Sequence, residues 1–311
     1  MAKFSFNTNK IFKVALIIYA VIFVVGAVLA FIPAWGVKMD INFSGGTRIS
    51  YSYTGDVAVK DFEATVKEVL KGDFTVSENT SIAGDTKTLS ISLVGKKSLA
   101  ADTQAKITET LTKKFTNNKF ELYDSTSVSP SIAGTFFAKS MVAVLITAIL
   151  VVIYVGIRFR RIGGVSAAIT ALAALVLDVL VTFFVCVIFR LQIDSNFIAV
   201  VLTMLGYSLN DTIVIYDRVR ENRRLYPELD TATLVNDSIN SVSTRNFVTT
   251  ITTLLAVLTI VVVAEIYGLT TLRTFAIPMA FGLVSGCLSS LFVSGPLWVI
   301  WKNRMDKKKA K

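Results

Sequence analysis

The chain contains six apolar runs, each of about 20 residues or more, separated by short polar segments and by one long hydrophilic region. A helix of that length crosses the hydrocarbon core of a bilayer, and lipid forces the backbone of such a run to satisfy its own hydrogen bonds. Hydrophobic residues make up 53% of the chain and charged residues 17%, with a mean hydropathy of +0.62. These values predict a polytopic α-helical membrane protein. The predicted transmembrane helices cover 14–34, 136–157, 162–189, 195–216, 245–264 and 274–301.

The distribution of basic residues predicts the topology of these helices. Both ends are expected in the cytosol, with a cytosolic N-terminus over 1–13 and a basic cytosolic tail over 302–311. The segments predicted inside hold 3, 3, 4 and 6 Lys or Arg residues, and the two short outer loops hold one each, Arg190 and Arg273. Residues 217–244 form a polar cytosolic segment in which a helix continues into the fifth span. The first run, 14–34, is longer than the core of a signal peptide and no Ala-x-Ala site follows it, so it is interpreted as an uncleaved helix.

Residues 35–135 have the composition of a water-soluble domain. Between 36 and 135 there are 12 basic and 12 acidic residues, so this region carries no net charge. Alternating and helical apolar patterns predict strands at 46–53, 74–77, 88–94 and 119–125, and helices at 58–70 and 99–115. The resulting order, β-α-β-β-α-β, is that of a ferredoxin-like α+β domain, placed outside the membrane between helices 1 and 2.

The composition also argues against several function classes. The net charge of +10 lies in short segments beside the apolar runs, which indicates membrane topology and not nucleic-acid binding. Histidine is absent, and the two cysteines, Cys186 and Cys287, both lie in apolar runs. No phosphate-binding loop is present. We therefore expect no metal site, no cofactor and no enzymatic activity.

Three ionisable residues lie within or at the edge of the predicted spans: Asp178, Asp211 and Arg245. A charge in hydrocarbon costs several kcal/mol on most scales, so each position calls for a reason. Helical spacing places Tyr207 and Ser208 on the same face as Asp211. Arg245 shares its face with small and hydroxyl-bearing residues, which could line a water-filled path. That ridge comprises Ser241, Thr249, Thr252, Ala256 and Thr259.

Two interpretations of Asp211 and Arg245 remain open. They form either a structural ion pair that fixes helix register or a proton-coupled switch. In the switch, Arg245 is the fixed cation, because arginine stays protonated in proteins, and Asp211 is the group that titrates. Asp178 either joins the proton path or makes a structural hydrogen bond, and its partner is not evident. A carboxylate beside hydroxyl groups suits H⁺ and Na⁺ equally.

Four segments resemble the SecF group of the SecD/SecF family of protein-export membrane proteins. The first follows helix 1 and contains Gly45, Gly46 and Thr47. The second, 206–222, is similar almost residue for residue to the fourth-helix motif of the family. The third enters the fifth helix at Ser243-Thr244-Arg245, and the fourth lies in the last helix with Ser289 and Ser290. The matching motif residues also include Gly206, Ser208, Asn210 and Thr212 of the fourth helix, and the glycines Gly282 and Gly286, which permit close helix packing.

The resemblance implies a fold like half of a resistance-nodulation-division transporter, with SecD supplying the other six helices. It places Asp211 on the family's transmembrane aspartate and Arg245 on its functional arginine. The implied activity is use of the proton-motive force, together with SecD, to draw secreted polypeptide out of the SecYEG channel. The implied location is the bacterial cytoplasmic membrane. The sequence differs from the family pattern at Leu177, where a histidine is common, and at Asn246, where threonine is usual.

Two other functions compete with this one. Half of a small-molecule or lipid exporter on the same scaffold would carry a larger external region and often a second set of helices in one chain. A non-transporting membrane assembly factor would use the Asp211–Arg245 pair only as structural support. Normal function after neutralisation of Asp211 would favour the assembly factor.

Overall fold

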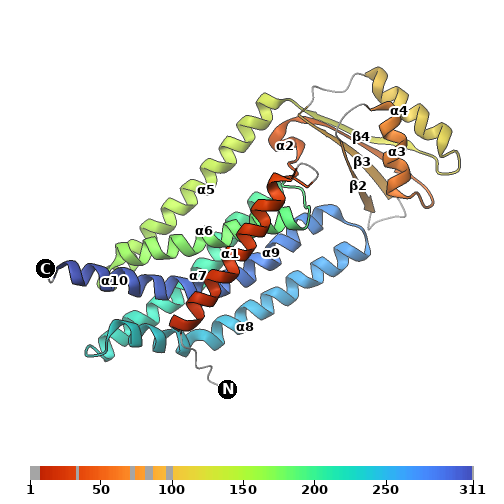
Figure 1. The fold of residues 1–311 in the computed structure, drawn as a ribbon. Helices are drawn as coiled ribbons and strands as arrows, with labels where there is room; N and C mark the ends of the chain where they lie inside the picture. Colours follow the sequence, from red (N-terminus) through yellow and green to blue (C-terminus); the bar gives the residue numbers. More distant parts are fainter. Residues whose placement is uncertain (1–7, 33–34, 71–73, 81–86, 96–100, 310–311) are drawn as a thin grey trace.

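The structure, a computed structural model, describes residues 8–32, 35–70, 74–80, 87–95 and 101–309. Within this described part, six helices are long and apolar enough to cross a membrane, and a small α+β domain lies between the first and the second of them (Figure 1). The predicted fold class is therefore confirmed. Residues 1–7 of the predicted N-terminal segment, 33–34 at the predicted end of the first span, and 310–311 of the tail lie outside the described residues.

The membrane helices differ from the predicted spans mainly at their ends. The fourth helix continues past the predicted end at Tyr216 as far as Leu225, and the fifth begins at Thr231, well before Arg245. These extensions bring most of the predicted polar segment 217–244 into a helical hairpin. The bounds are α1 Thr8–Phe31, α5 Pro130–Arg158, η1 Arg160–Ile162, α6 Gly164–Ile188, α7 Ser195–Leu225 and α8 Thr231–Ile266, and the sixth span comprises α9 Thr270–Ser289, η2 Ser290–Ser294 and α10 Gly295–Lys309.

Polar residues at the helix ends explain where α7 and α8 begin. The Asp194 carboxylate accepts hydrogen bonds from the backbone N–H groups of Asn196 and Phe197, at 2.9 and 3.2 Å. Asp230 caps α8 in the same way through two backbone N–H groups. An Asp at the N-cap satisfies amides that have no partner inside the helix, so both starts are encoded locally.

The sixth span contains a π-helical turn, Ser290–Ser294, between α9 and α10. Such turns commonly occur at functional sites and shift the helix face by one residue. Here the turn directs the Ser290 hydroxyl to the Ser208 carbonyl of α7, at 3.2 Å. The irregularity therefore lies where the sixth span meets the fourth.

The α+β domain has the predicted order of elements. Its four antiparallel strands are arranged β2-β3-β1-β4, which is the ferredoxin-like order. Two helices pack over one face, and their core includes Ile49 and Tyr51 of the central strand with Phe62 and Leu111 of the helices. The bounds are α2 Ile41–Ser44, β1 Gly46–Tyr53, α3 Val59–Val69, β2 Thr75–Thr80, β3 Lys87–Val94, α4 Ala101–Lys114 and β4 Glu121–Val128, of which only α2 was not predicted.

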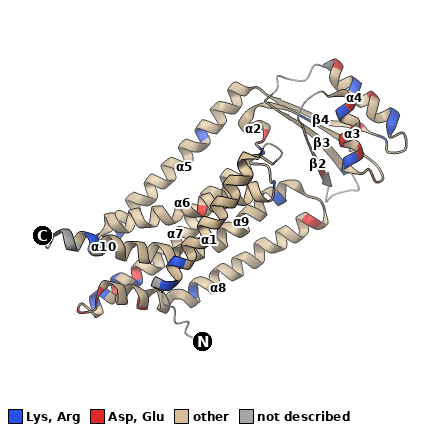
Figure 2. Ribbon diagram, viewed as in Figure 1, with Lys and Arg blue, Asp and Glu red and all other residues tan. Residues whose placement is uncertain are grey.

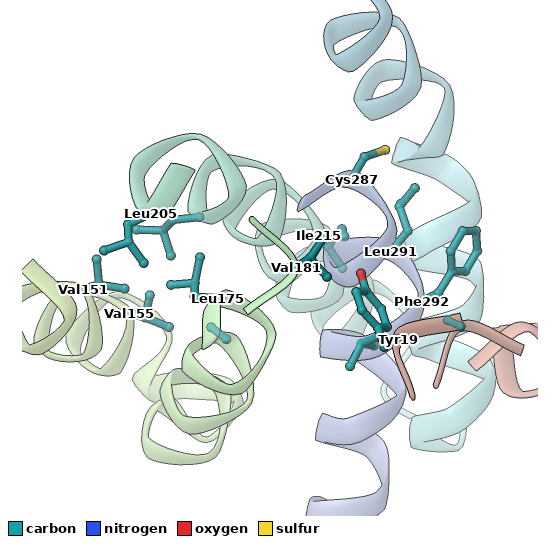
Figure 3. Packing of buried hydrophobic residues seen from close by; sticks show 14 of the residues in the cluster. Tyr19, Val151, Val155, Leu175, Val181, Leu205, Ile215, Cys287, Leu291 and Phe292 are labelled. Atoms are coloured by element: carbon teal, nitrogen blue, oxygen red, sulfur yellow. The ribbon is translucent and has the colours of Figure 1, made fainter. Parts of the chain in front are cut away.

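The helices bury a continuous apolar core that joins the first span to the last. Tyr19 of α1 lies in the same cluster as Leu291 and Phe292 of the sixth span (Figure 3). The sixth span is largely buried, whereas α5 exposes most of its apolar residues, as expected for a helix that faces lipid. Charged residues gather in the α+β domain and toward the helix ends, and only a few lie along the spans (Figure 2).

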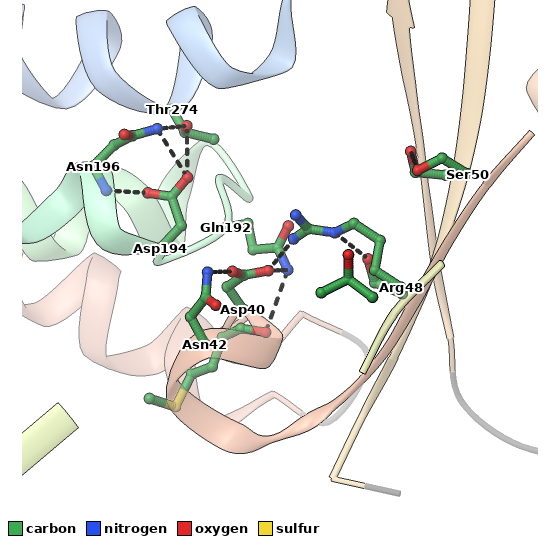
Figure 4. A network of polar contacts seen from close by, with 12 residues as sticks. Asp40, Asn42, Arg48, Ser50, Gln192, Asp194, Asn196 and Thr274 are labelled. Carbon is green, nitrogen blue, oxygen red and sulfur yellow. Dashed lines mark hydrogen bonds and ion pairs between the residues drawn. The ribbon is translucent and has the colours of Figure 1, made fainter. Parts of the chain in front are cut away.

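A polar junction fixes the α+β domain to the helices. Asp40, which is 1% exposed, accepts hydrogen bonds from Asn42 and Gln192 and forms an ion pair with Arg48 of β1 (Figure 4). The backbone of 38–40 pairs with Ile193 in the loop between α6 and α7. That loop leads directly into the α7 cap, so the domain is attached at the start of the helix that carries Asp211.

Candidate functional site

Helices α7 and α8 run antiparallel, and three side-chain contacts fix their register. The Tyr207 hydroxyl lies 3.4 Å from Thr253 Oγ1, Arg218 Nε donates to Ser241 Oγ at 3.1 Å, and Asn222 Nδ2 donates to Ser238 Oγ at 2.8 Å. From the first pair to the third, the residue number increases along α7 and decreases along α8. Interpolation between these contacts places Asp211 level with residues 248 and 249 of α8.

Asp211 is buried, with 2% of the residue exposed, and its Oδ2 atom accepts no hydrogen bond in the structure. Arg245 is the charged residue that acts electrostatically on this carboxyl group. Its side chain is nevertheless exposed on the outside of the bundle and lies beyond the 4.0 Å limit of an ion pair with Asp211. The contact pair expected from sequence is therefore not formed in this conformation.

Most of the predicted hydroxyl ridge beside Arg245 also faces outward. Ser241, Thr252, Ala256 and Thr259 are exposed, and Thr249 is half-buried. Lipid cannot solvate an arginine or these hydroxyl groups well, so this face of α8 suits water or another protein surface. Because most of the ridge faces outward, it does not line the predicted water-filled path inside this chain.

The inward face of α8 instead presents Asn246 and Thr250 toward α7. They are 1% and 5% exposed; Asn246 Nδ2 has no hydrogen-bond partner in the structure, and Thr250 Oγ1 has no neighbour for a hydrogen bond except the weak Cys287 thiol. Sequence reasoning missed both residues as candidates. Their spacing of four on one helix face, at the level of Asp211, was the signal that could have identified them.

Asp178 lies at the meeting point of three helices and has the partners that the sequence did not reveal. Its carboxylate accepts hydrogen bonds from Ser208 of α7 at 2.6 Å, and from Ser285 and Ser289 of α9 at 2.6 and 2.8 Å. The Tyr19 hydroxyl of α1 donates to the Ser285 carbonyl at 3.1 Å. Three hydroxyl donors directed at one carboxyl group match the acceptor sites of an ionised carboxylate.

A column of hydroxyl groups extends from Asp178 along the seam between α7 and the sixth span. Thr212 and Ser290 lie 2.9 Å apart, and Tyr216 and Ser294 lie 2.7 Å apart. Positions 208, 212 and 216 recur every four residues, so one face of α7 supplies the whole series. The motif residues Gly206 and Asn210 lie on the opposite, exposed side of α7.

The two glycines of the sixth span lie at close helix contacts. A Cβ atom at Gly286 would be 3.1 Å from Ser208 Cβ, and one at Gly282 would be 3.0 Å from Met204 Sδ. The absence of side chains lets α9 approach α7 closely enough for its serines to reach Asp178. Small residues serve this purpose widely in membrane helix packing.

The motif after helix 1 lies far from the carboxylates, at the junction of the α+β domain. Gly45 and Gly46 have φ values of 74° and 141°, and a Cβ atom at Gly46 would be 2.0 Å from the Leu93 carbonyl oxygen. The Thr47 hydroxyl is buried 3.2 Å from Ser127 Oγ of the neighbouring strand. These residues therefore turn the chain tightly from α2 into β1.

In the part of the chain that the structure describes, no group of three or more His, Cys, Asp or Glu side chains is arranged to hold a metal ion. The chemistry available at the embedded site is that of two carboxyl groups, hydroxyl groups and one outward arginine. Proton transfer or binding of a monovalent cation is compatible with these groups.

The family model "Protein export membrane protein SecD/SecF, C-terminal" matches residues 107–304, more than half of the chain. The protein translocase subunit SecF of Sebaldella termitidis is 33% identical over 265 residues, covering 84% of this chain and 81% of that protein. The SecDF subunit of Bacillus subtilis is also 33% identical, covering 98% of this chain and 39% of that protein.

The fold is similar to that of solved SecDF structures. The crystal structure of SecDF from Thermus thermophilus, described as a translocon-associated membrane protein, superposes with a TM-score of 0.78 at 26% identity and covers 96% of this chain. The chain spans 39% of that protein, and 40% of a second SecDF structure in a super-membrane-facing form. It therefore corresponds to about two fifths of each SecDF chain. Sequence, fold and motif positions agree that the chain belongs to the SecD/SecF family of protein-export membrane proteins.

Proposed function

We propose that the chain is a SecF-type subunit of the Sec protein-export machinery, which acts with SecD to use the proton-motive force to promote polypeptide translocation. The observation that carries this proposal is Asp211, a buried carboxyl group in a membrane-spanning helix with an unpartnered oxygen. Intramembrane ionisable groups of this kind mark proton and ion paths. The names of the similar proteins supply the cargo, a translocated polypeptide.

In the proposed mechanism Asp211 is the group that gains and loses a proton, and Arg245 is a fixed positive charge. Ionised Asp211 attracts Arg245 and favours approach of the two side chains, whereas protonated Asp211 does not. The absence of an ion pair in this conformation is what the protonated state would produce. Alternation between the two states moves α8 relative to α7.

The energy available from the membrane potential is adequate for such a motion. One elementary charge crossing 100 mV releases about 2.3 kcal/mol. A two-state equilibrium that starts near balance is shifted about fiftyfold by this energy. The α7 cap and the Asp40 junction would carry the shift to the α+β domain, since both lie at the same end of α7.

Asp178 was predicted as a third coupling residue, and its geometry supports a narrower role. Its carboxylate is held by three hydroxyl donors from two helices. We propose that Asp178 anchors α6, α7 and α9 as a rigid unit, against which α8 moves. Ser208 links this anchor to α7 one turn before Asp211.

The exposed Arg245 face supports SecD as the partner. The chain matches two fifths of the longer SecDF proteins, so those relatives carry a further, longer part in the same polypeptide. A partner helix bundle against α8 would shield Arg245 from lipid. We further propose that the termini lie in the cytosol, the α+β domain lies outside the cytoplasmic membrane, and the complex acts beside SecYEG.

The test is protein export in bacterial cells whose only copy of this subunit is Asp211→Asn, Arg245→Met or the double variant, at matched membrane abundance. Each variant should reduce the export that depends on proton-motive force at least tenfold, and the double variant should be no worse than Asp211→Asn. Thr203→Val is the control, because Thr203 is exposed on α7 and bonds only to its own helix. Normal export with Asp211→Asn would exclude the proton switch and favour the assembly-factor alternative.

A further inference from the structure

In the described parts of α7 and α8, three buried polar atoms have no nitrogen or oxygen partner, and they belong to Asp211, Asn246 and Thr250. They are Asp211 Oδ2, Asn246 Nδ2 and Thr250 Oγ1, and each residue is at least 95% buried. Buried polar atoms are nearly always paired, because an unmade hydrogen bond costs about 1–3 kcal/mol. Three unpaired atoms in the membrane-embedded part of one helix pair therefore need an explanation.

These atoms lie at one level of the bundle. The α7–α8 register places Asp211 opposite residues 248 and 249, so Asn246 and Thr250 bracket it on the inward face of α8. The Cys287 thiol of α9 neighbours Thr250, which places α9 beside this level of α8. The three side chains therefore lie in the same region of the bundle.

The hydrogen-bonding chemistry of the cluster matches a neutral carboxylic acid. A protonated carboxyl group has one O–H donor and one carbonyl acceptor. The Thr250 hydroxyl can accept from the O–H group, and the Asn246 amide can donate to the carbonyl. An ionised carboxylate has no O–H group to offer Thr250, and it is attracted more strongly by the charge of Arg245.

We propose that Asn246 and Thr250 are positioning residues that bind the protonated form of Asp211. This inference rests on the proposed function and extends it by naming the groups that stabilise the proton-loaded state. A proton from water adds to one Asp211 oxygen, that O–H turns to Thr250, and the other oxygen accepts from Asn246. Release of the proton removes the O–H donor to Thr250, and the ionised carboxylate then favours the charge of Arg245.

The other titratable or charged groups around Asp211 do not supply this complement. Arg245 of α8 has no acceptor for the carboxyl O–H group of protonated Asp211. Its positive charge stabilises the ionised form instead. The Cys287 thiol of α9 is a weak donor and a weak acceptor. Asp178 of α6 is already saturated by serine hydroxyl groups, and Tyr207 of α7 is directed to Thr253.

Infrared difference spectroscopy on the full-length chain in lipid, with the partner that copurifies with it, tests the proposal. The carbonyl band of protonated Asp211 is assigned by its loss in Asp211→Asn. In Asn246→Leu the band should move to higher frequency, because the carbonyl loses its donor. In Thr250→Val the ratio of protonated to ionised Asp211 at a fixed pH within the titration should fall about fivefold, which corresponds to about 1 kcal/mol for one hydrogen bond.

Conservative variants separate hydrogen bonding from packing. Thr250→Ser and Asn246→Thr retain a hydroxyl or a donor and should retain the wild-type band and titration, and Thr203→Val should also match wild type. Asn246→Leu and Thr250→Val are measured separately, so failure of one to fold leaves the other decisive. Wild-type spectra in both, or no Asp211 carboxyl band at any accessible pH, would overturn the inference.

The export assay distinguishes this failure from failure of the proposed function. If Asp211→Asn blocks export while Asn246→Leu and Thr250→Val leave the spectra unchanged, only the role of these two residues is wrong. If Asp211→Asn exports normally, the proton switch itself is wrong.

Discussion

Ser285 on the sixth span donates a 2.6 Å hydrogen bond to Asp178 on the third, although 107 positions separate them in the chain. Both residues are buried, and Ser289 one turn later donates to the same carboxylate at 2.8 Å. This relationship fixes α9 to α6 at mid-bundle. Ser208 of α7 donates to the same Asp178 carboxylate, so α6, α7 and α9 are held together next to Asp211.

Removing one donor should weaken this frame measurably. Ser285→Ala and Ser289→Ala are each expected to lower the free energy of unfolding by about 1 kcal/mol, a typical value for side-chain hydrogen bonds between membrane helices. Asp178→Ala should cost more than either, because it leaves three hydroxyl groups unpaired. Unfolding by SDS titration in mixed micelles gives these values.

Ser140→Ala is the matched control, since Ser140 is half-buried on α5 and bonds only to the Phe136 carbonyl of its own helix. If Ser285→Ala is as harmless as Ser140→Ala, the Asp178 cluster does not hold the helices together.

The ion pair between Arg48 and Asp40 should secure the α+β domain to the bundle. Arg48→Met removes one partner of a carboxylate that is 1% exposed, and we expect a loss of about 1–3 kcal/mol, moderated because Arg48 is 34% exposed. Amide exchange of Ile193, which donates to the Lys38 carbonyl, should accelerate correspondingly. Hydrogen-exchange mass spectrometry reports this change.

Lys87→Met provides the contrast, because it breaks an ion pair in which Asp56 is exposed to solvent. Exposed pairs contribute little, so no change in Ile193 exchange is expected. Equal effects of the two substitutions would mean that the Asp40 junction does not attach the domain.

Gly46 should be intolerant of any side chain. In Gly46→Ala the new Cβ atom would lie 2.0 Å from the Leu93 carbonyl oxygen, at a φ of 141° that L-residues rarely adopt. We expect a loss of at least about 2 kcal/mol in stability and a lower abundance in the membrane. Gly134→Ala on α5, where nothing lies within 4 Å of the added atom, should be neutral or slightly stabilising. Thermal unfolding of the two purified variants compares them directly, and similar midpoints would contradict the tight-turn argument.

Asp194 should make stability depend on pH. Burial raises the pKa of Asp194 above its usual value of 3.8, even though its cap and Thr274 hydrogen bonds act the other way. The folded state therefore binds a proton more readily than the unfolded state, so stability falls as pH rises from about 4 through the folded-state pKa. Asp194→Asn, which can still cap α7, should flatten that part of the curve.

The measurement is the difference in unfolding midpoint between wild type and Asp194→Asn across the acidic range. The difference should favour the wild type least at the upper end of that range, where the half-buried Asp194 carboxylate is charged. A difference that does not change with pH would contradict the assigned titration.

Several features were determined by the sequence alone. Long apolar runs must become helices in lipid, so the six spans and their approximate positions could be predicted. The alternating pattern of Gly46–Tyr53 gave the bounds of β1 that the structure has, because strand periodicity is a local property. Asp178 and Asp211 stood out because any carboxyl group within an apolar run is costly.

Other features depended on tertiary structure. Nothing in the sequence near Asp178 indicates Ser285 and Ser289, since their contact requires the packing of α9 on α6 and the approach that Gly286 permits. Helical spacing placed Arg245 on a face of α8 but could not say whether that face turns toward Asp211 or away from it. The rotation of a helix is set by its neighbours, and here the packing of α7 and α9 turns Asn246 and Thr250 inward and Arg245 outward.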